Sequence, residues 1–184
     1  VLGEVYYRNA AKTKRVGLEF GTQLEIIKNL NFGITYTWSD FDYLTYEAQT
    51  IEIDTAGNML TNNRDFSGNI VPSVPVNNLY LSLAYSLPVG KHHNLFARTS
   101  YQGISGMWVD DANTDKTGSY NLLNAVIGAD LRWGKFNLMV SGGVNNIFDE
   151  IYVGFTNTNS ANKRYYEAGA PRDFFVSLNL GYVF

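Results

Sequence analysis

The chain has 184 residues, a formal net charge of −3, no cysteine and 15% aromatic residues. The lack of cysteine excludes disulfides and thiolate chemistry within these residues, and an acidic chain lacks the basic surface that nucleic-acid binding needs. No run of 18 apolar residues occurs, so a transmembrane helix is excluded. A strand that crosses a membrane needs only about ten residues, with every second one apolar. The composition is therefore compatible with a β-structured membrane protein.

Apolar and polar side chains alternate with a period of two along nearly the whole chain. Within residues 30–38, every second side chain is large and apolar: Leu30, Phe32, Ile34, Tyr36 and Trp38. Successive side chains of a strand point to opposite faces, so each segment of this kind has one apolar and one polar face. The pattern predicts an all-β, antiparallel fold of about seven strands, at residues 14–27, 30–46, 76–89, 95–107, 119–133, 136–153 and 173–184.

The connections between the predicted strands alternate in length. Tight turns are expected at residues 28–29, 90–94 and 134–135. Longer loops, rich in Asn, Thr, Asp and Gly, are expected at residues 47–75, 108–118 and 154–172. Short turns at one end and long loops at the other are typical of a transmembrane outer-membrane barrel, in which the turns are periplasmic and the loops extracellular.

A soluble β-sandwich or a lipocalin also has alternating strands, and two features count against it. The apolar face has aromatic residues at strand ends, at Trp38, Trp133 and Phe136, as expected for residues at a membrane interface. The opposite face is too polar for a dry core, because it contains Glu19, Gln23, Glu25, Arg98, Gln102, Asp130 and Arg132. We therefore interpret the pattern as a membrane barrel with a wet lumen.

Two segments near the C-terminus contain the most specific motifs. Residues 143–152 read G-V-N-N-I-F-D-E-I-Y, and residues 165–172 read Y-Y-E-A-G-A-P-R. The first resembles the G-V-x-N-L-F-D-x-x-Y stretch in the penultimate strand of TonB-dependent outer-membrane receptors. The second resembles the Y-x-x-G-x-P-R approach to their final strand. Weaker likenesses to the same family are the start of a strand at residues 7–19 and the Val-Pro pair at 74–75.

The last predicted strand has a regular apolar series that ends on an aromatic residue: Val176, Leu178, Leu180, Tyr182 and Phe184. This series resembles the C-terminal signal by which the barrel-assembly machinery recognises outer-membrane proteins. The resemblance makes that machinery an expected partner, together with lipopolysaccharide and lipid.

The resemblance implies that residues 1–184 are the C-terminal part of a larger, plugged barrel of about 22 strands. Seven strands agree with this, because a closed single-chain bacterial barrel has an even number. The plug and the segment that contacts the TonB-ExbB-ExbD complex would lie upstream of this chain. The implied function is energised uptake of a scarce nutrient, most often a ferric siderophore, with cobalamin, haem, other metals and glycans as open alternatives. A passive porin or a barrel enzyme is the alternative class, and an upstream plug would separate these classes.

Candidate ligand contacts lie in the expected extracellular loops, at Trp108, Arg164, Tyr165 and Tyr166. Aromatic rings and Arg suit a bulky and often anionic chelate, although packing of the loops and the rim explains these residues equally well. Asn146 and Asp149 are expected to make local backbone hydrogen bonds where the strand leaves the membrane. A turn that restarts strand pairing is expected at 169–171.

No catalytic site, metal site or cofactor is expected from the remaining residues. His92 and His93 lie in a predicted periplasmic turn, far from the loop acids, so neither a two-His metal site nor a Ser-His-Asp arrangement is favoured. The Asp110-Asp111 and Asp149-Glu150 pairs are candidate Ca²⁺ ligands, but solvated loop acids are the expectation because the spacing of a calcium loop is missing. The basic run at residues 12–15 is either a contact for lipopolysaccharide phosphates or, by default, a solvated strand end.

Overall fold

The computed structural model describes residues 12–53, 57–160 and 166–184, and it confirms the all-β fold class. Eleven strands occur in these ranges: β1 Lys12–Ile27, β2 Leu30–Thr45, β3 Glu47–Ile53, β4 Met59–Asp65, β5 Asn77–Val89, β6 His93–Ile104, β7 Tyr120–Trp133, β8 Phe136–Asn145, β9 Val153–Thr156, β10 Tyr166–Ala168 and β11 Asp173–Tyr182. Within the described ranges, no helix is long and apolar enough to cross a membrane.

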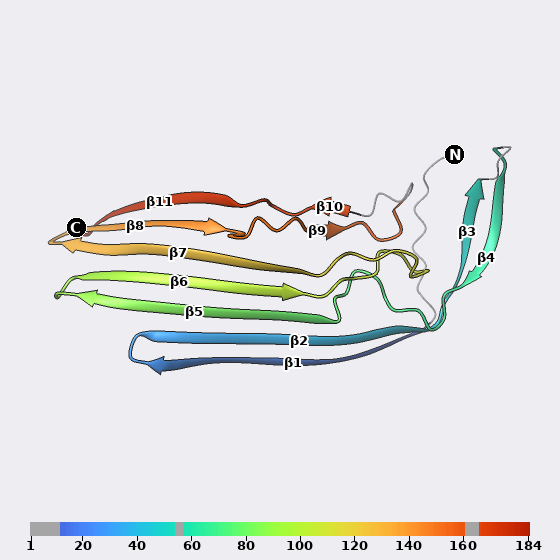
Figure 1. Cartoon of the computed structure of the whole chain (residues 1–184), viewed down its shortest axis with the longest axis horizontal. Helices are drawn as coiled ribbons and strands as arrows, with labels where there is room; N and C mark the ends of the chain where they lie inside the picture. The colour runs from blue at the N-terminus through green and yellow to red at the C-terminus, as the bar shows by residue number, and fades with distance from the viewer. Residues whose placement is uncertain (1–11, 54–56, 161–165) are drawn as a thin grey trace.

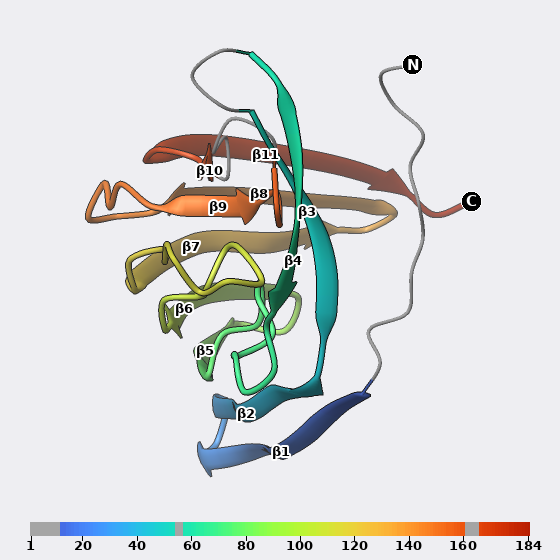
Figure 2. The same cartoon turned by 90° about the vertical axis from the view of Figure 1, so that its right-hand side faces the viewer.

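Seven of the strands form one antiparallel sheet in the order β1-β2-β5-β6-β7-β8-β11. The strands lie along the long axis of the molecule, with the tight turns at one end and the long connections at the other (Figure 1). We call these the turn end and the loop end. Seen from the loop end, the sheet is strongly curved and has a concave side (Figure 2). All seven predicted strands are confirmed, and the turns after β1 and β7 contain left-handed residues, Asn29 and Gly134.

The sequence-based boundaries are wrong in two connections. The predicted strand 136–153 ends at Asn145, because Asn146 and Asp149 have φ angles of +50° and +55° that interrupt strand pairing. The predicted loop 47–75 contains the β3–β4 hairpin, and the predicted loop 154–172 contains most of the short β9–β10 pair. These hairpins form separate two-stranded sheets of short strands, so they leave no long period-two signal.

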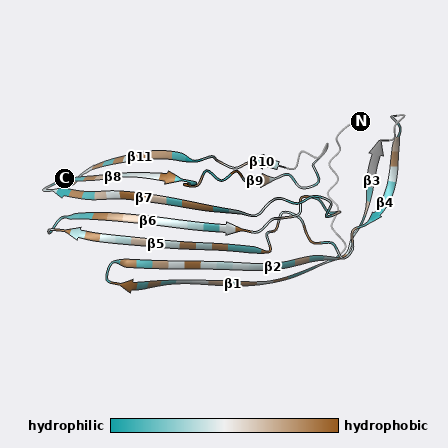
Figure 3. Cartoon of the chain, in the orientation of Figure 1, coloured by the Kyte–Doolittle hydropathy of each residue, from teal (hydrophilic) through white to brown (hydrophobic). Residues whose placement is uncertain are grey.

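The register of the main sheet separates one apolar face from one polar face. Directly paired residues on the apolar face form a row across six strands, Leu30, Tyr85, Ala97, Ile127, Gly142 and Val176. The neighbouring row on the other face consists of Asn31, Ala84, Arg98, Val126, Gly143 and Phe175. Apolar and polar colours alternate along these strands (Figure 3). The predicted division of the two faces is confirmed by this register.

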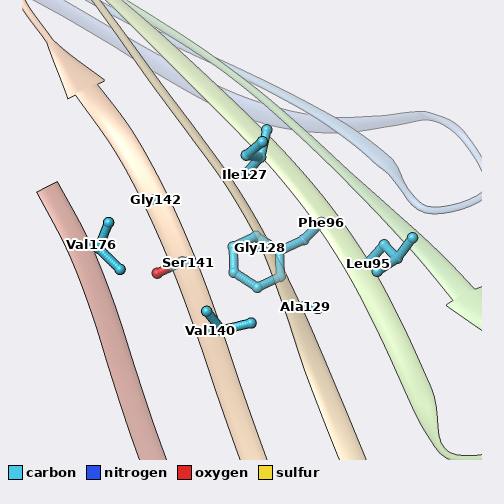
Figure 4. Close-up of a pocket in the computed structure, with 9 residues that line it drawn as sticks. All are labelled: Leu95, Phe96, Ile127, Gly128, Ala129, Val140, Ser141, Gly142 and Val176. Atoms are coloured by element: carbon cyan, nitrogen blue, oxygen red, sulfur yellow. The ribbon is translucent and has the colours of Figure 1, made fainter. Parts of the chain in front are cut away.

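The apolar face of the sheet is exposed, and a shallow groove of about 540 Å³ is open on it. The exposed fraction is 83% for Val176 and 70% for Leu178. Residues of four strands, β6, β7, β8 and β11, line the groove (Figure 4). Leu95, Ile127, Ala129, Val140, Gly142 and Val176 belong to the apolar face, and Phe96, Gly128 and Ser141 alternate with them in the register. An apolar surface this large needs an apolar surrounding, as the wall of a membrane barrel has on its outside.

Two glycines on the polar face make room for aromatic rings. Phe96 is paired with Gly128 and its ring lies over that residue (Figure 4), while Phe175 is paired with Gly143. A Cβ atom on Gly128 would overlap Cζ of Phe96 and lie 2.6 Å from the carbonyl oxygen of Val140. These positions are closed to any larger residue because the neighbouring ring and backbone leave no space.

We expect Gly128→Ala in the full-length protein to lower the free energy of unfolding by about 1–3 kcal/mol, the usual cost of overpacking. Gly21→Ala is the matched control on the same face, because the nearest atom to its new Cβ would be Oγ1 of Thr35 at 3.8 Å. The control should be neutral or slightly stabilising, since alanine restricts the unfolded chain. Urea unfolding measures both variants, and equal effects at the two glycines would contradict the packing argument.

Buried side chains gather at the loop end and not between the strands of the sheet. Among the described residues they are Tyr43, Phe66, Pro72, Val109, Asp110, Asp111, Thr117, Tyr120, Asn146 and Thr156. The sheet therefore has no core of its own on either face, whereas the three long connections share a small one.

Candidate functional site

The loop end is the part of the structure where segments distant in sequence come together. Three connections meet there, at residues 46–76, 105–119 and 146–172. Side-chain hydrogen bonds join all three, for example between Ser73 Oγ and Thr156 Oγ1 at 2.8 Å. Each connection is therefore held by contacts that are distant in sequence.

Asp111 is the centre of these contacts and is only 7% exposed. Its carboxylate accepts hydrogen bonds from Tyr43 Oη at 2.7 Å, Tyr46 Oη at 3.1 Å and Asn159 Nδ2 at 2.8 Å. Its backbone N–H donates to Asn159 Oδ1 at 3.0 Å, and its carbonyl accepts from Asn69 Nδ2 at 2.7 Å. Burial, and then the hydrogen bond to Asp111, raise the pKa of Tyr43, so the phenol stays protonated and donates.

The expectation of solvated acids at Asp110-Asp111 is wrong. Asp110 is also buried, and its carboxylate accepts hydrogen bonds from the backbone N–H of Thr114 at 2.9 Å and from its hydroxyl at 2.7 Å. This is a local turn in which both carboxylate oxygens of Asp110 accept a hydrogen bond. Both acids therefore hold loop structure, and the described residues contain no group of three His, Cys, Asp or Glu placed to hold a metal ion.

The N-N-I-F-D segment forms the rim above β8, as expected. Asn146 is 4% exposed, its Nδ2 donates to the carbonyl oxygens of Glu150 at 2.9 Å and Ala170 at 3.2 Å, and its Oδ1 accepts from the N–H of Glu150 at 2.9 Å. Asp149 accepts a hydrogen bond from the backbone N–H of Arg172 at 2.9 Å. The bonds to Glu150 confirm the predicted local backbone contacts of Asn146, whereas the Asp149 carboxylate bonds a residue 23 positions away and not a local one. The bonds to Ala170 and Arg172 join the start of the β8–β11 connection to its end.

Two of the four predicted ligand contacts lie in the described part of the chain. Trp108 is partly exposed, and Lys116 Nζ lies 5.3 Å from its ring centroid. Tyr166 is the first residue of β10 and is 42% exposed. The other two, Arg164 and Tyr165, lie outside the described residues. Ligand contact by these four residues stays a prediction.

Tyr166 lines a pocket of about 370 Å³ at the loop end, together with two tyrosines that sequence reasoning did not single out. The rings of these two, Tyr120 and Tyr152, are 4.6 Å apart. Tyr152 is the last residue of the motif in residues 143–152, so the motif could have identified it as a candidate site residue. Tyr120 has no such signal, because only the fold brings the start of β7 next to the β8–β9 connection. Trp108 is not part of this lining, so the structure does not combine all the predicted contacts into one pocket.

The two histidines lie at the turn end, as predicted. His93 begins β6, its Nδ1 accepts a hydrogen bond from the backbone N–H of Arg132 at 3.2 Å, and its ring lies 5.4 Å from that of Trp133. The whole length of the sheet separates this position from the loop acids (Figure 1). A Ser-His-Asp arrangement with the loops is therefore excluded for His93.

The basic run at the start of β1 makes contacts within the wall. Lys14 pairs with Asp40 at 3.1 Å and Asp42 at 3.6 Å, and the Arg15 guanidinium lies 5.6 Å from the centroid of the Phe41 ring. The hydrogen bond and charge of Asp40 raise the pKa of Lys14. Lys14 is thus partly neutralised by its neighbours, which weakens the case for a phosphate contact there.

The five residues of the proposed assembly signal are exposed on the apolar face, at and just beyond the edge strand β11. Near the turn end, Tyr182 contacts Phe136 at 5.0 Å and Phe184 at 5.2 Å between ring centroids. The aromatic group at this end fits a membrane interface. Recognition of Val176, Leu178, Leu180, Tyr182 and Phe184 by the assembly machinery stays a prediction.

Comparison with known proteins agrees with the geometry. The family described as TonB dependent receptor-like, beta-barrel, matches residues 2–147. The ferrichrome outer membrane transporter/phage receptor of Escherichia coli (strain K12) is 26% identical over 152 residues, which are 82% of this chain and 18% of that protein. Two receptors of Acinetobacter baumannii share the fold: the ferric preacinetobactin receptor BauA, with a TM-score of 0.68 at 15% identity, and the siderophore receptor PiuA, with 0.66 at 22%. Each structural match covers 92% of this chain and 22% of the other.

The chain spans about a fifth of the length of these relatives. The family match extends over most of the seven-stranded sheet, and the solved structures have the same antiparallel wall. The apolar face is the lipid side of such a wall, and the place of the protein is the bacterial outer membrane. This chain is a segment of the β-barrel of a TonB-dependent receptor and belongs to that family.

Proposed function

We propose that the full-length protein binds a ferric siderophore, or a similar metal chelate, at the loop end and imports it into the periplasm without chemical change. The loop end would then be extracellular and the turn end periplasmic. The TonB-ExbB-ExbD complex would act through a plug outside this chain, and lipopolysaccharide would surround the wall. The observation that carries the proposal is the tyrosine-lined pocket at the loop end of a family barrel.

The chemistry of the pocket supports a bulky chelate as ligand. The pocket has a volume of about 370 Å³, which is sufficient for one arm of such a molecule. Its lining includes Tyr120, Tyr152 and Tyr166. Tyrosine provides a broad apolar ring together with a hydroxyl that can donate or accept a hydrogen bond. The names of the relatives point the same way, since they include a ferrichrome transporter and a ferric preacinetobactin receptor.

Uptake of iron-labelled siderophores by cells that express the full-length protein tests the proposal. With ferrichrome and a ferric catecholate as probes, we expect saturable uptake of at least one that disappears when TonB is deleted. Tyr166→Ala should weaken its binding about 10-fold, which corresponds to about 1.4 kcal/mol. His92→Ala is the control, because this exposed residue lies in the turn between β5 and β6 and should leave binding unchanged.

The alternative classes predict different results. Uptake that persists without TonB and does not saturate would indicate a passive porin. Chemical conversion of the probe by the purified receptor would indicate a barrel enzyme. A large loss of uptake in His92→Ala, with normal amounts of protein in the membrane, would show that the two ends have been assigned wrongly.

A further inference from the structure

The β3–β4 hairpin stands across the loop end of the barrel wall. In Figure 1 it rises transverse to the seven strands, beyond the other connections, and in Figure 2 it crosses in front of the concave side from β2 toward β11. Its two strands pair only with each other, from Glu47–Asp65 to Ile53–Met59. The side chains of β4 are all exposed. The described hydrogen bonds between the hairpin segment and the wall lie at its base, next to Tyr46 and Phe66.

That attachment is a compact structure on the upper part of β2. Phe66, which directly follows β4, is buried, and its ring centroid lies 5.4 Å from that of Tyr46. Its N–H donates to the carbonyl of Tyr46 at 2.7 Å, and the N–H of Gly68 donates to the carbonyl of Tyr43 at 2.6 Å. Ser67 Oγ accepts from the N–H of Tyr46 at 2.9 Å. Both ends of the hairpin are thus fixed to the same pair of tyrosines.

Asp111 holds this pair of tyrosines from the opposite side. The phenols of Tyr43 and Tyr46 donate to its two carboxylate oxygens, while Asn159 of the β8–β11 connection forms a two-bond contact with it. Its partners among the described residues are neutral. Hydrogen bonds to an ionised acceptor are roughly twice as strong as neutral ones, and their loss would leave buried donors unsatisfied. One side chain therefore joins the attachment of the hairpin to both other connections.

We propose that Asp111 is the positioning residue that holds the β3–β4 hairpin across the loop end and makes the three connections move as one unit. The proposal does not depend on which ligand the receptor takes. If Asp111 stabilised only its own turn, the hairpin would keep its place when Asp111 is removed. The backbone bonds of Phe66 and Gly68 to Tyr46 and Tyr43 would then be sufficient to hold it. The two readings differ in the behaviour of the hairpin when Asp111 is removed.

Distances between spin labels in the full-length receptor distinguish them. Thr61 on β4 and Lys91 at the turn end are exposed, and this chain contains no cysteine of its own, so Thr61→Cys and Lys91→Cys provide a unique pair here. We expect one narrow distance distribution in the parent protein. Asp111→Ala should broaden it about twofold, as local release of a segment does, while the thermal unfolding of the barrel stays unchanged.

Asp115→Ala is the matched control in the same connection. Its carboxylate is exposed and accepts a hydrogen bond from the N–H of the adjacent Lys116, at 2.8 Å. This variant should keep the narrow distribution, and Asp111→Asn should give an intermediate width because it retains one acceptor oxygen. A distribution in Asp111→Ala as narrow as in the parent would overturn the proposal, and so would an equal broadening in Asp115→Ala.

A second set of variants serves if Asp111→Ala does not assemble. Tyr46→Phe removes one donor to the carboxylate, and Asn159→Ser removes the amide that donates to the carboxylate and accepts from the Asp111 N–H. Each should broaden the distribution by a smaller amount than Asp111→Ala. Unchanged distributions in both would overturn the proposal. A drop in the barrel unfolding temperature that accompanies any broadening would do the same, because it would show a general structural role.

Discussion

Arginine in place of Ile34 is expected to destabilise the barrel in lipid, lowering its free energy of unfolding by about 2–4 kcal/mol, the cost of a charge near the middle of the membrane. Ile34 lies on the apolar face, where its direct partners are Thr22 and Leu81. The next residue, Thr35, is exposed on the polar face and pairs with Tyr80. The same replacement at Thr35 leaves the arginine in water and should have a small effect.

The two variants are matched, because they put the same residue on the same strand one position apart. Reversible folding of the full-length receptor into lipid vesicles, followed by urea titration, measures both free energies. Similar losses at Ile34 and Thr35 would show that the faces have been assigned wrongly. A larger loss at Thr35 would reverse them.

The replacement Asn146→Ala is expected to lower the free energy of unfolding by about 2–4 kcal/mol, from lost hydrogen bonds to a buried group and from a strained φ angle. Its side chain makes three hydrogen bonds that join the start of the β8–β11 connection to its end. Alanine replaces none of them and also tolerates the φ of +50° poorly. Local loosening of the connection should follow.

The neighbouring Asn145 is the control for this prediction. Its side chain donates one exposed hydrogen bond, to Asp173 Oδ1 at 3.0 Å, so Asn145→Ala should cost less than about 1 kcal/mol. Urea unfolding gives the stabilities, and hydrogen exchange at residues 147–152 reports the local effect. If both variants lost the same small amount of unfolding free energy, the side-chain hydrogen bonds of Asn146 would not be what stabilises this connection.

The wall of the barrel could be predicted from the sequence because its signal is local. Each strand must place apolar side chains toward lipid on one face only, and this requirement repeats every two residues for ten or more residues. The alternation from Leu30 to Trp38 is such a signal, and the structure starts β2 at Leu30. The tight turn before it was also visible, since Asn29 is one of the few residues that tolerate a left-handed conformation.

The loop end could not be predicted in the same way because its contacts are distant in sequence. Asp111 had the appearance of a solvated acid, and only the fold brings Tyr43 and Tyr46 within hydrogen-bond distance of it. The same holds for the tyrosine pocket, where the start of β7 meets β10. A pair of acids in a polar loop has the same local pattern whether it is solvated or buried.

The hydrogen bonds between distant segments lie at the loop end, so the resistance of this wall to a pulling force should depend on the end that is pulled. At the turn end, the described contacts join strands that are neighbours in the sheet, such as His93 of β6 and Trp133 of β7, and the turns after β1, β5 and β7 are short. At the loop end, Asp111 joins Tyr43 of β2 to Asn159 of the β8–β11 connection, and Ser73 joins the β2–β5 connection to Thr158 of the same β8–β11 connection. Under tension from the turn end, the hairpins should peel away one at a time in a series of small force steps. Under tension from the loop end, the wall should resist as a single block and fail in one large step.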